Sequence, residues 1–201
     1  WAGTGDNIPE ECLSNTDIGL MQINIPPNIN NLYYGGFCND MIWPLFHYFP
    51  TKSEMNEDYY NAYVHANQLF CKKLVEEIRP GDMVWIHDYQ LFLLPGMIRK
   101  HIPDISIGFF LHIPYPSYEI FRLIPKSWRN EILKGILGSD LVGFHTNDYT
   151  QYFIKSVKRT LGYECRNNMI YTDERIIRAD AFPIGIDYDK FHNATNNAAV
   201  E

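Results

Sequence analysis

The sequence predicts an α/β fold with a doubly wound parallel sheet, arranged as a Rossmann-like lobe. The first observation is that short, continuous apolar runs alternate along the chain with segments whose apolar residues recur at three- and four-residue steps. The second is that these runs lack polar alternate positions, which is typical of parallel strands covered by helices on both faces. Because crossovers between parallel strands are right-handed, this order gives a Rossmann-like arrangement.

The N-terminal part of the chain carries the weakest structural signals. Residues 1–16 are rich in turn-forming residues and are expected to be a loop. Residues 18–25 form an apolar run that is expected to be a strand and is ended by two prolines. Residues 30–37 are predicted to be a short irregular helix or turn, and residues 43–50 form an aromatic segment bounded by prolines.

From residue 57 onwards, helices and strands alternate clearly. A helix is predicted over residues 57–78, because apolar residues recur there at helical spacing and Pro80-Gly81 ends the pattern. The strands predicted after it are residues 83–87, 105–111, 141–145 and 176–182. The helices predicted between them are residues 91–100, 118–123, 129–137 and 147–161.

Length, composition and charge set limits on the function. With 201 residues, of which 46% are hydrophobic, the chain is long enough for one domain with a sizeable core. A formal charge of -7 without any run of lysine or arginine argues against nucleic acid and against an anionic membrane surface as partners. A phosphorylated small molecule remains compatible, because strand-end loops and helix N-termini bind anions locally.

The cysteines and the lack of targeting signals predict a cytoplasmic protein. Cys12, Cys38, Cys71 and Cys165 show neither a CxxC pair nor regular spacing, so we interpret them as reduced thiols. No signal peptide is evident, and no apolar stretch approaches the roughly 20 residues needed to span a bilayer. The sequence also lacks GxGxxG after a strand and a P-loop motif, which argues against the nucleotide sites built on them.

Three of the predicted strands end at a histidine. His87, followed by Asp88, ends the first of them, and His112 and His145 end the next two. The carboxyl ends of parallel strands face one crevice, which is where ligands bind in such sheets. The sequence therefore predicts a ligand site at this rim of the sheet.

Each of these residues also has a structural alternative. Asp88 is suited to cap the helix that follows it. His112 is compatible with a core position bonded to a backbone carbonyl, although the sudden polarity change after a buried run favours ligand contact. His145 is the weakest candidate, because Thr146 or Asn147 beside it makes a good helix cap.

A metal site at the same rim is a further alternative. His87, Asp88, His112 and His145 are residue types that suit zinc or iron. However, no HExxH motif and no pair of histidines at helical spacing occurs, and the four residues come from different strands. We therefore predict no metal cofactor.

Aromatic residues in the N-terminal third of the chain are candidates for a surface on which a sugar ring stacks. Aromatic side chains at helical spacing belong more often to a core, and we assign Tyr59 and Tyr63 to it. Tyr48, in a loop beside Pro50, is the better candidate for ligand contact. The cluster comprises Trp43, Phe46, Tyr48, Tyr59, Tyr60 and Tyr63.

Seven ordered motifs resemble the trehalose-6-phosphate synthase family, over a stretch from near Trp1 to Asp187. They are Trp43-Pro-Leu-Phe-His-Tyr48, Tyr63-x-x-x-Asn67, Trp85-Ile-His-Asp-Tyr89, Gly108-Phe-Phe-Leu-His-Ile-Pro-Tyr-Pro116, Glu119-Ile-Phe121, Asp140-Leu-Val-Gly-Phe-His-Thr146 and Phe182-Pro-Ile-Gly-Ile-Asp187.

The resemblance implies a retaining glycosyltransferase with two Rossmann-like lobes (the GT-B fold) that needs no metal. Such an enzyme transfers glucose from UDP-glucose to glucose 6-phosphate. Residues 1–187 then form the acceptor-binding lobe, incomplete at its N-terminus, and residues 188–201 begin the connection to a missing donor-binding lobe. We expect the 201 residues alone to be inactive, and a homo-oligomer remains one alternative for the full protein.

The resemblance also assigns site residues. Tyr48 matches a tyrosine that contacts the acceptor phosphate, and Asp88 matches an aspartate that binds acceptor hydroxyls. His112 matches a catalytic-cleft histidine beside the donor glucose. Trp1 is aligned with a tryptophan near the acceptor, and Tyr60 stands where the family has an acceptor-contacting tryptophan.

Two departures keep other functions open. Tyr60 replaces the usual tryptophan, which favours a related enzyme with another acceptor, such as glycerol 3-phosphate, as an alternative. Gln90 replaces the histidine usual after the His-Asp-Tyr motif. A non-catalytic regulatory homologue is a third interpretation, against which the presence of Tyr48, Asp88 and His112 argues.

Overall fold

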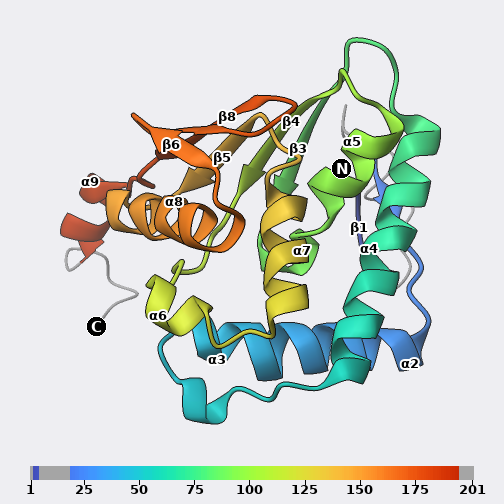
Figure 1. Cartoon of the computed structure of the whole chain (residues 1–201), viewed down its shortest axis with the longest axis horizontal. Coiled ribbons are helices and arrows are strands. Elements are labelled where there is room, and N and C mark those ends of the chain that lie inside the picture. The colour runs from blue at the N-terminus through green and yellow to red at the C-terminus, as the bar shows by residue number, and fades with distance from the viewer. Residues whose placement is uncertain (1, 5–18, 195–201) are drawn as a thin grey trace.

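A six-stranded mixed sheet with the strand order β3-β4-β5-β8-β7-β6 organises the structure (Figure 1). The computed structural model describes residues 2–4 and 19–194. Four neighbouring strands are parallel and two are antiparallel. The parallel strands are β3 (Met83–His87), β4 (Ser106–Phe110), β5 (Leu141–Phe144) and β8 (Ile176–Ala181).

The helices that precede the parallel strands lie close to where the sequence predicts them. They are α4 (Glu57–Glu77) before β3, α5 (Leu94–His101) before β4, α6 (Tyr118–Phe121) and α7 (Lys126–Ile136) before β5, and α8 (Asn147–Leu161) before β8. Two of these helices begin at a side-chain cap, because Asn56 accepts the Asp58 amide and Thr146 accepts the Tyr149 amide. The α/β, Rossmann-like fold class is thus confirmed.

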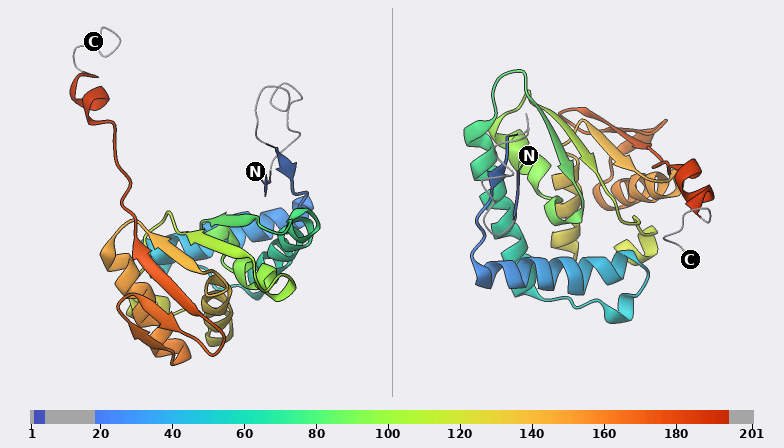
Figure 2. Two further views of the ribbon diagram at one scale, coloured as in Figure 1. Left: turned by 90° about the horizontal axis from the view of Figure 1, so that it is seen from above. Right: turned by 180° about the vertical axis from the view of Figure 1, so that it is seen from behind.

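The sheet is covered by helices on one face within the described residues. The helices lie together on one side of the strands, and the other side carries the segments that lead to the two ends of the chain (Figure 2). Side chains alternate accordingly: Ile86 and Phe109 are buried, whereas Met83 and Trp85 are 76% and 68% exposed. The expectation that helices cover both faces of the sheet is therefore wrong for the described residues, because one face of strands such as β3 is open.

An antiparallel hairpin at the edge of the sheet was not predicted. β6 (Glu164–Arg166) and β7 (Met169–Tyr171) are joined by Asn167 and Asn168, which adopt φ values of +49° and +61°. Two consecutive left-handed residues make a type I′ turn, for which asparagine is well suited. The purely parallel sheet of the prediction is thus corrected to a parallel sheet with an antiparallel edge.

A long helical segment takes the place of the short irregular helix or turn predicted over residues 30–37. It consists of α2 (Pro27–Asn30), the π-helix η1 (Asn31–Ile42) and α3 (Trp43–Phe46), and it continues through η2 (Pro50–Lys52) towards α4. It packs on α4 through aromatic contacts, such as the Phe37 and Tyr63 rings with centroids 4.2 Å apart. The apolar residues of this segment are at helical spacing, and the glycines within it hid the pattern.

The remaining elements are short. β1 (Ala2–Gly3) and β2 (Met21–Gln22) form a separate two-stranded parallel sheet, so the strand predicted over residues 18–25 is reduced to two residues. The 3-10 helix η3 (Tyr89–Leu91) follows β3, and α9 (Tyr188–His192) ends an extended segment that leaves the body after β8 (Figure 2). Most of the predicted loop 1–16 and residue 18 lie outside the described residues.

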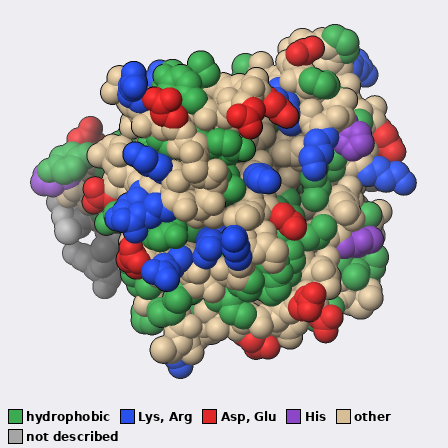
Figure 3. All heavy atoms as spheres, viewed as in Figure 1, with side chains coloured by type: hydrophobic (Ala, Val, Ile, Leu, Met, Phe, Trp, Pro, Cys, Tyr) green, Lys and Arg blue, Asp and Glu red, His purple; other side chains and the backbone are tan. Residues whose placement is uncertain are grey.

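Two surface properties bear on the function classes that the sequence excludes. On the helix-bearing face, lysine and arginine side chains are interspersed with aspartate and glutamate (Figure 3). No helix in the described part of the chain combines the length and apolarity that crossing a membrane requires.

Cys38, Cys71 and Cys165, the described cysteines, are free thiols, as predicted.

We expect Gly135→Ala to destabilise the fold without touching the rim of the sheet. A Cβ at Gly135, on α7, would collide with the Phe92 carbonyl oxygen and lie 2.7 Å from the Leu93 Cα, and both are backbone atoms before α5. Forcing the two segments apart should cost about 1–3 kcal/mol of unfolding free energy. Urea denaturation would measure this loss. The control is Gly35→Ala in η1, where a Cβ meets no atom within 4 Å, and an equal effect of both variants would contradict the prediction.

Candidate functional site

Three histidines meet at the carboxyl ends of β3, β4 and β5. Strand register sets this, because His87 pairs with Phe110 and Phe110 pairs with Gly143. His87 Nδ1 lies 2.8 Å from His112 Nε2, and the ring centroids of His112 and His145 are 5.8 Å apart. The structure therefore brings together the histidines that the sequence assigned to one rim.

Asp88 links the first of these strand ends to the second. Its Oδ1 accepts the backbone N–H of His112 at 3.1 Å, and its own N–H donates to the Phe110 carbonyl at 2.8 Å. Its side chain makes no cap hydrogen bond to η3, so the helix-cap alternative is wrong. The carboxylate instead fixes the backbone that carries His112.

Two of the rim residues have a strained backbone. Tyr48 has φ +66° and Asp88 has φ +72°. Non-glycine residues in this region are uncommon and cost on the order of 1–3 kcal/mol each. Such strain clusters at active and ligand-binding sites, and here it falls on two residues that the sequence had already selected.

Tyr48 lies in the loop after α3 and reaches across to the loop after β4. Its hydroxyl oxygen accepts the backbone N–H of Ser117 at 2.9 Å, and the residue is 47% exposed. The tyrosine is thereby held against the same 111–117 loop that carries His112. Ser117 takes part through its backbone alone, so no sequence signal pointed to it.

The loop after Asp88 rests on a buried aromatic hydroxyl. Tyr63 is fully buried on α4, donates its hydroxyl to the Tyr89 carbonyl at 2.7 Å and accepts the Phe92 N–H at 2.8 Å. Asn67 adds a bond from its Nδ2 to the Gln90 carbonyl. The Tyr63-x-x-x-Asn67 motif therefore positions the strand-end loop from the core, which fits the prediction that Tyr63 is a core residue.

The surroundings of the histidine pair affect its protonation. The pKa of His87 is lowered, first by partial burial and second by the facing His112, while the nearby Asp88 carboxylate acts in the opposite direction. Because Nδ1 and Nε2 face each other at 2.8 Å, a single proton fits between them. One hydrogen therefore joins the two rings, donated by one of them to the other.

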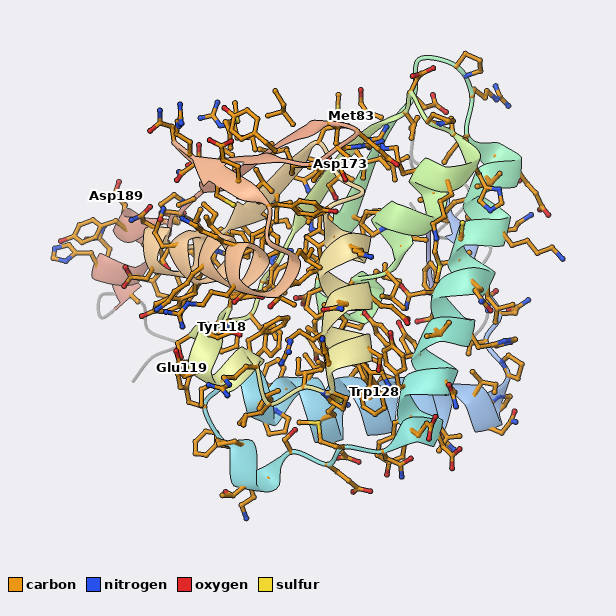
Figure 4. The ribbon with its side chains drawn as sticks, viewed as in Figure 1. Met83, Tyr118, Glu119, Trp128, Asp173 and Asp189 are labelled. Atoms are coloured by element: carbon orange, nitrogen blue, oxygen red, sulfur yellow. The ribbon has the colours of Figure 1, made fainter. Side chains whose placement is uncertain are left out.

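Tyr60 is buried between α4 and α7 in this structure. It is 5% exposed on α4, its ring stacks on Trp128 of α7 with centroids 4.6 Å apart, and its hydroxyl donates to Glu131 at 2.6 Å. Trp128 lies at the N-terminal end of α7 (Figure 4). Burial raises the pKa of Tyr60 first, and the Glu131 hydrogen bond raises it further. A direct acceptor contact, as expected for Tyr60, does not fit this placement.

The other predicted site residues divide between the core and the surface. Tyr59 is partly buried against the core, as predicted for it, and Phe46 is fully buried. Trp43 is 46% exposed and its ring packs at a tilt on the His47 ring, with centroids 4.2 Å apart. Trp1 lies outside the described residues.

A cavity of about 570 Å³ adjoins His87 on the side of β1. Tyr33 and Tyr34 of η1, together with Trp85 and Gln90, contribute to its lining. The two tyrosines were not among the predicted site residues, because nothing in the short helix or turn predicted over residues 30–37 indicated that its aromatic side chains face the strand ends. In residues 2–4 and 19–194, no group of three or more histidine, cysteine or acidic side chains could hold a metal ion.

Comparisons with known proteins give similarities in sequence and in structure. The model of glycosyltransferase family 20 matches residues 6–201. The alpha,alpha-trehalose-phosphate synthase (UDP-forming) of Pichia angusta is 45% identical over 178 residues, which is 86% of this chain and 37% of that protein.

Two solved structures share the fold. An alpha,alpha-trehalose-phosphate synthase (UDP-forming) from Burkholderia xenovorans, in complex with glucose-6-phosphate, superposes with a TM-score of 0.76 at 27% identity, covering 88% of this chain and 38% of the other. The N-terminal domain of trehalose-6-phosphate phosphatase from Candida albicans gives 0.81 at 32% identity, covering 94% and 40%. The chain thus spans well under half the length of each of these proteins.

Proposed function

The chain belongs to glycosyltransferase family 20, and on this basis we propose that it forms the acceptor-binding lobe of an alpha,alpha-trehalose-phosphate synthase. The full enzyme would transfer glucose from UDP-glucose to glucose 6-phosphate, with retention at the anomeric carbon. The observation that carries the proposal is the linkage of Tyr48, Asp88 and His112 at one rim of the sheet. The name of the Pichia relative and the ligand of the Burkholderia structure support it.

In this proposal each rim residue has a separate role. The Tyr48 hydroxyl, beside the Ser117 amide, contacts the acceptor phosphate. The Asp88 carboxylate binds acceptor hydroxyls through the oxygen that the His112 amide does not use. His112 is exposed at the strand end and lies beside the donor glucose.

The chemistry that this rim supports is positioning and charge stabilisation. In the same-face mechanism that we propose, the acceptor hydroxyl attacks the anomeric carbon as the bond to UDP breaks, and its proton passes to the leaving phosphate. Holding the two sugars in contact converts an encounter of two molecules into a reaction within one complex. Fixed dipoles and hydrogen bonds around the developing charge lower the barrier further.

The division of the chain and its setting are part of the same proposal. Residues 1–187 are the acceptor-binding lobe, and residues 188–201 begin the connection to a donor-binding lobe. The enzyme acts in the cytoplasm and requires no metal. The 201 residues alone should release no UDP, because the groups that hold the nucleotide belong to the second lobe.

UDP release by the product of the complete gene tests the proposal. The enzyme would be given UDP-glucose with glucose 6-phosphate, with glycerol 3-phosphate or with no acceptor. We expect release with glucose 6-phosphate alone, because the rim is matched to a phosphorylated hexose. Release with glycerol 3-phosphate only would keep the glycosyltransferase and replace the acceptor.

A non-catalytic homologue in a trehalose-synthesising complex is the second candidate. The resemblance to the N-terminal domain of the Candida phosphatase favours it, because that domain shares the fold in a protein named for another activity. The same assay separates the two candidates. A folded gene product that releases no UDP with any acceptor would support the non-catalytic protein.

A further inference from the structure

The hydrogen bond between His87 and His112 has no part in the proposed function described so far. The two rings come from neighbouring strands, with centroids 5.1 Å apart and planes inclined by 29°. On its other side His87 stacks on Trp85, with centroids 5.5 Å apart and an interplanar angle of 12°. The His87 ring is therefore held in place, with its Nδ1 directed at His112.

His112 itself is restrained from several directions. Its backbone N–H is bound by Asp88, and its ring contacts Phe110 at 4.8 Å and His145 at 5.8 Å between centroids. Its Nε2 is occupied by the bond to His87. The nitrogen of His112 left to face a sugar is therefore Nδ1.

The bond between the two rings also determines where protons lie. A neutral imidazole carries its proton on one nitrogen, and a hydrogen bond to the other nitrogen selects the tautomer. If His87 Nδ1 donates to His112 Nε2, the proton of neutral His112 lies on its Nδ1, which is then a donor. If His112 Nε2 instead donates to His87 Nδ1, the Nδ1 of His112 carries no proton and is an acceptor. In either case His112 Nδ1 has one role towards a sugar hydroxyl, as donor or as acceptor. A ring without this bond would exchange between the two tautomers.

We propose that His87 is a positioning residue, which orients the His112 ring and fixes which form of its Nδ1 meets the donor glucose. The inference rests on the proposed function, since it acts through the substrate contact of His112. His87 acts through His112 and does not need to contact the substrate itself. Partial burial first, and the facing ring second, lower the pKa of His87, which favours its neutral form.

Three substitutions of His87 separate positioning from packing. Asparagine places a polar atom close to the position of Nδ1, glutamine places it closer to the position of Nε2, and leucine has no polar atom. His87→Leu and His87→Gln should therefore lower kcat roughly tenfold, the effect of losing about one net hydrogen bond. His87→Asn should restore most of kcat, and the KM for glucose 6-phosphate should stay unchanged in all three variants. His65→Asn, at an exposed position on α4, is the matched control.

A spectroscopic measurement tests the inference independently of the assay. In the complete gene product labelled with ¹⁵N-histidine, the ring nitrogen shifts of His112 should show one tautomer. His87→Leu should give a mixture, and His87→Asn should keep a single form. If the unaltered protein releases no UDP, the proposed function fails, while a single His112 tautomer that depends on residue 87 would still support the inference.

Two results would overturn the positioning role. The first is that all three variants keep the kcat and the His112 tautomer of the unaltered protein. The second is that asparagine, glutamine and leucine lower kcat equally and in step with a loss of thermal stability, which indicates packing alone.

Discussion

Asp88→Asn is expected to lower kcat/KM for glucose 6-phosphate about 100-fold while leaving the fold intact. Asparagine tolerates the left-handed conformation that residue 88 adopts at φ +72°, and its Oδ1 can still accept the His112 amide. What it loses is the charge that strengthens hydrogen bonds to acceptor hydroxyls, and bonds to charged groups are the stronger ones. Steady-state UDP release at varied glucose 6-phosphate measures the change.

Two further variants make this result specific. Asp104→Asn changes an exposed aspartate away from the rim and should leave kcat/KM unchanged. Asp88→Ala removes the acceptor for the His112 amide and should lower both activity and melting temperature. Normal activity of Asp88→Asn would contradict the role given to the carboxylate in acceptor binding.

Arg99→Met is expected to cost about 3–5 kcal/mol of unfolding free energy, because it removes several hydrogen bonds from a charged, buried donor that each contribute roughly 1.5–3 kcal/mol. Arg99 on α5 is 9% exposed, and its guanidinium donates to the carbonyls of Gly138, Pro103 and Ile105. It also pairs with Asp140 at 2.8 Å. Its removal takes away these hydrogen bonds where α5, the start of β4 and the start of β5 meet, although Gly138 keeps a bond from Arg175 and Asp140 keeps one from the Ile107 amide.

Urea denaturation of Arg99→Met, with Lys100→Met as an exposed neighbouring control, measures this cost. Arg99→Lys should recover less than half of the loss, because a single ammonium cannot replace the fork of donors that spans these separate partners. A loss below about 1 kcal/mol for Arg99→Met, within the range of a surface ion pair, would show that the network is not a structural support.

The strand ends were predictable from the sequence because polarity changes there abruptly. The runs before His87, His112 and His145 are strongly apolar, and each run stops at its histidine or just before it. Parallel pairing then places the three ends at one edge of the sheet, and the register decides which of their side chains touch. The α/β class and most element bounds after residue 57 follow from the same alternation.

The contacts that complete the site could not be predicted, because they join residues far apart in the chain. The bond from the Ser117 amide to Tyr48 spans 69 residues, and the amide involved is part of the backbone. The positive φ of Tyr48 leaves no mark on its residue type, since tyrosine is not a residue that favours this conformation.

Tyr60 shows the limit of transferring a role by position. Its place in the motif resembles that of an acceptor-contacting tryptophan, yet its ring packs on Trp128 and its hydroxyl is bound to Glu131. Nothing in the spacing of α4 distinguishes a ring that turns to the rim from one that turns to α7. Packing against a distant helix decides between them.

A crystal structure of the complete gene product with UDP and glucose 6-phosphate tests the central claim most directly, namely that the carboxyl rim of the sheet binds the acceptor. We predict the phosphate within hydrogen-bond distance of the Tyr48 hydroxyl, a sugar hydroxyl on the Asp88 carboxylate and His112 facing the space between the substrates. Glucose 6-phosphate bound away from these three residues, for example in the cavity lined by Tyr33 and Trp85, would contradict the claim.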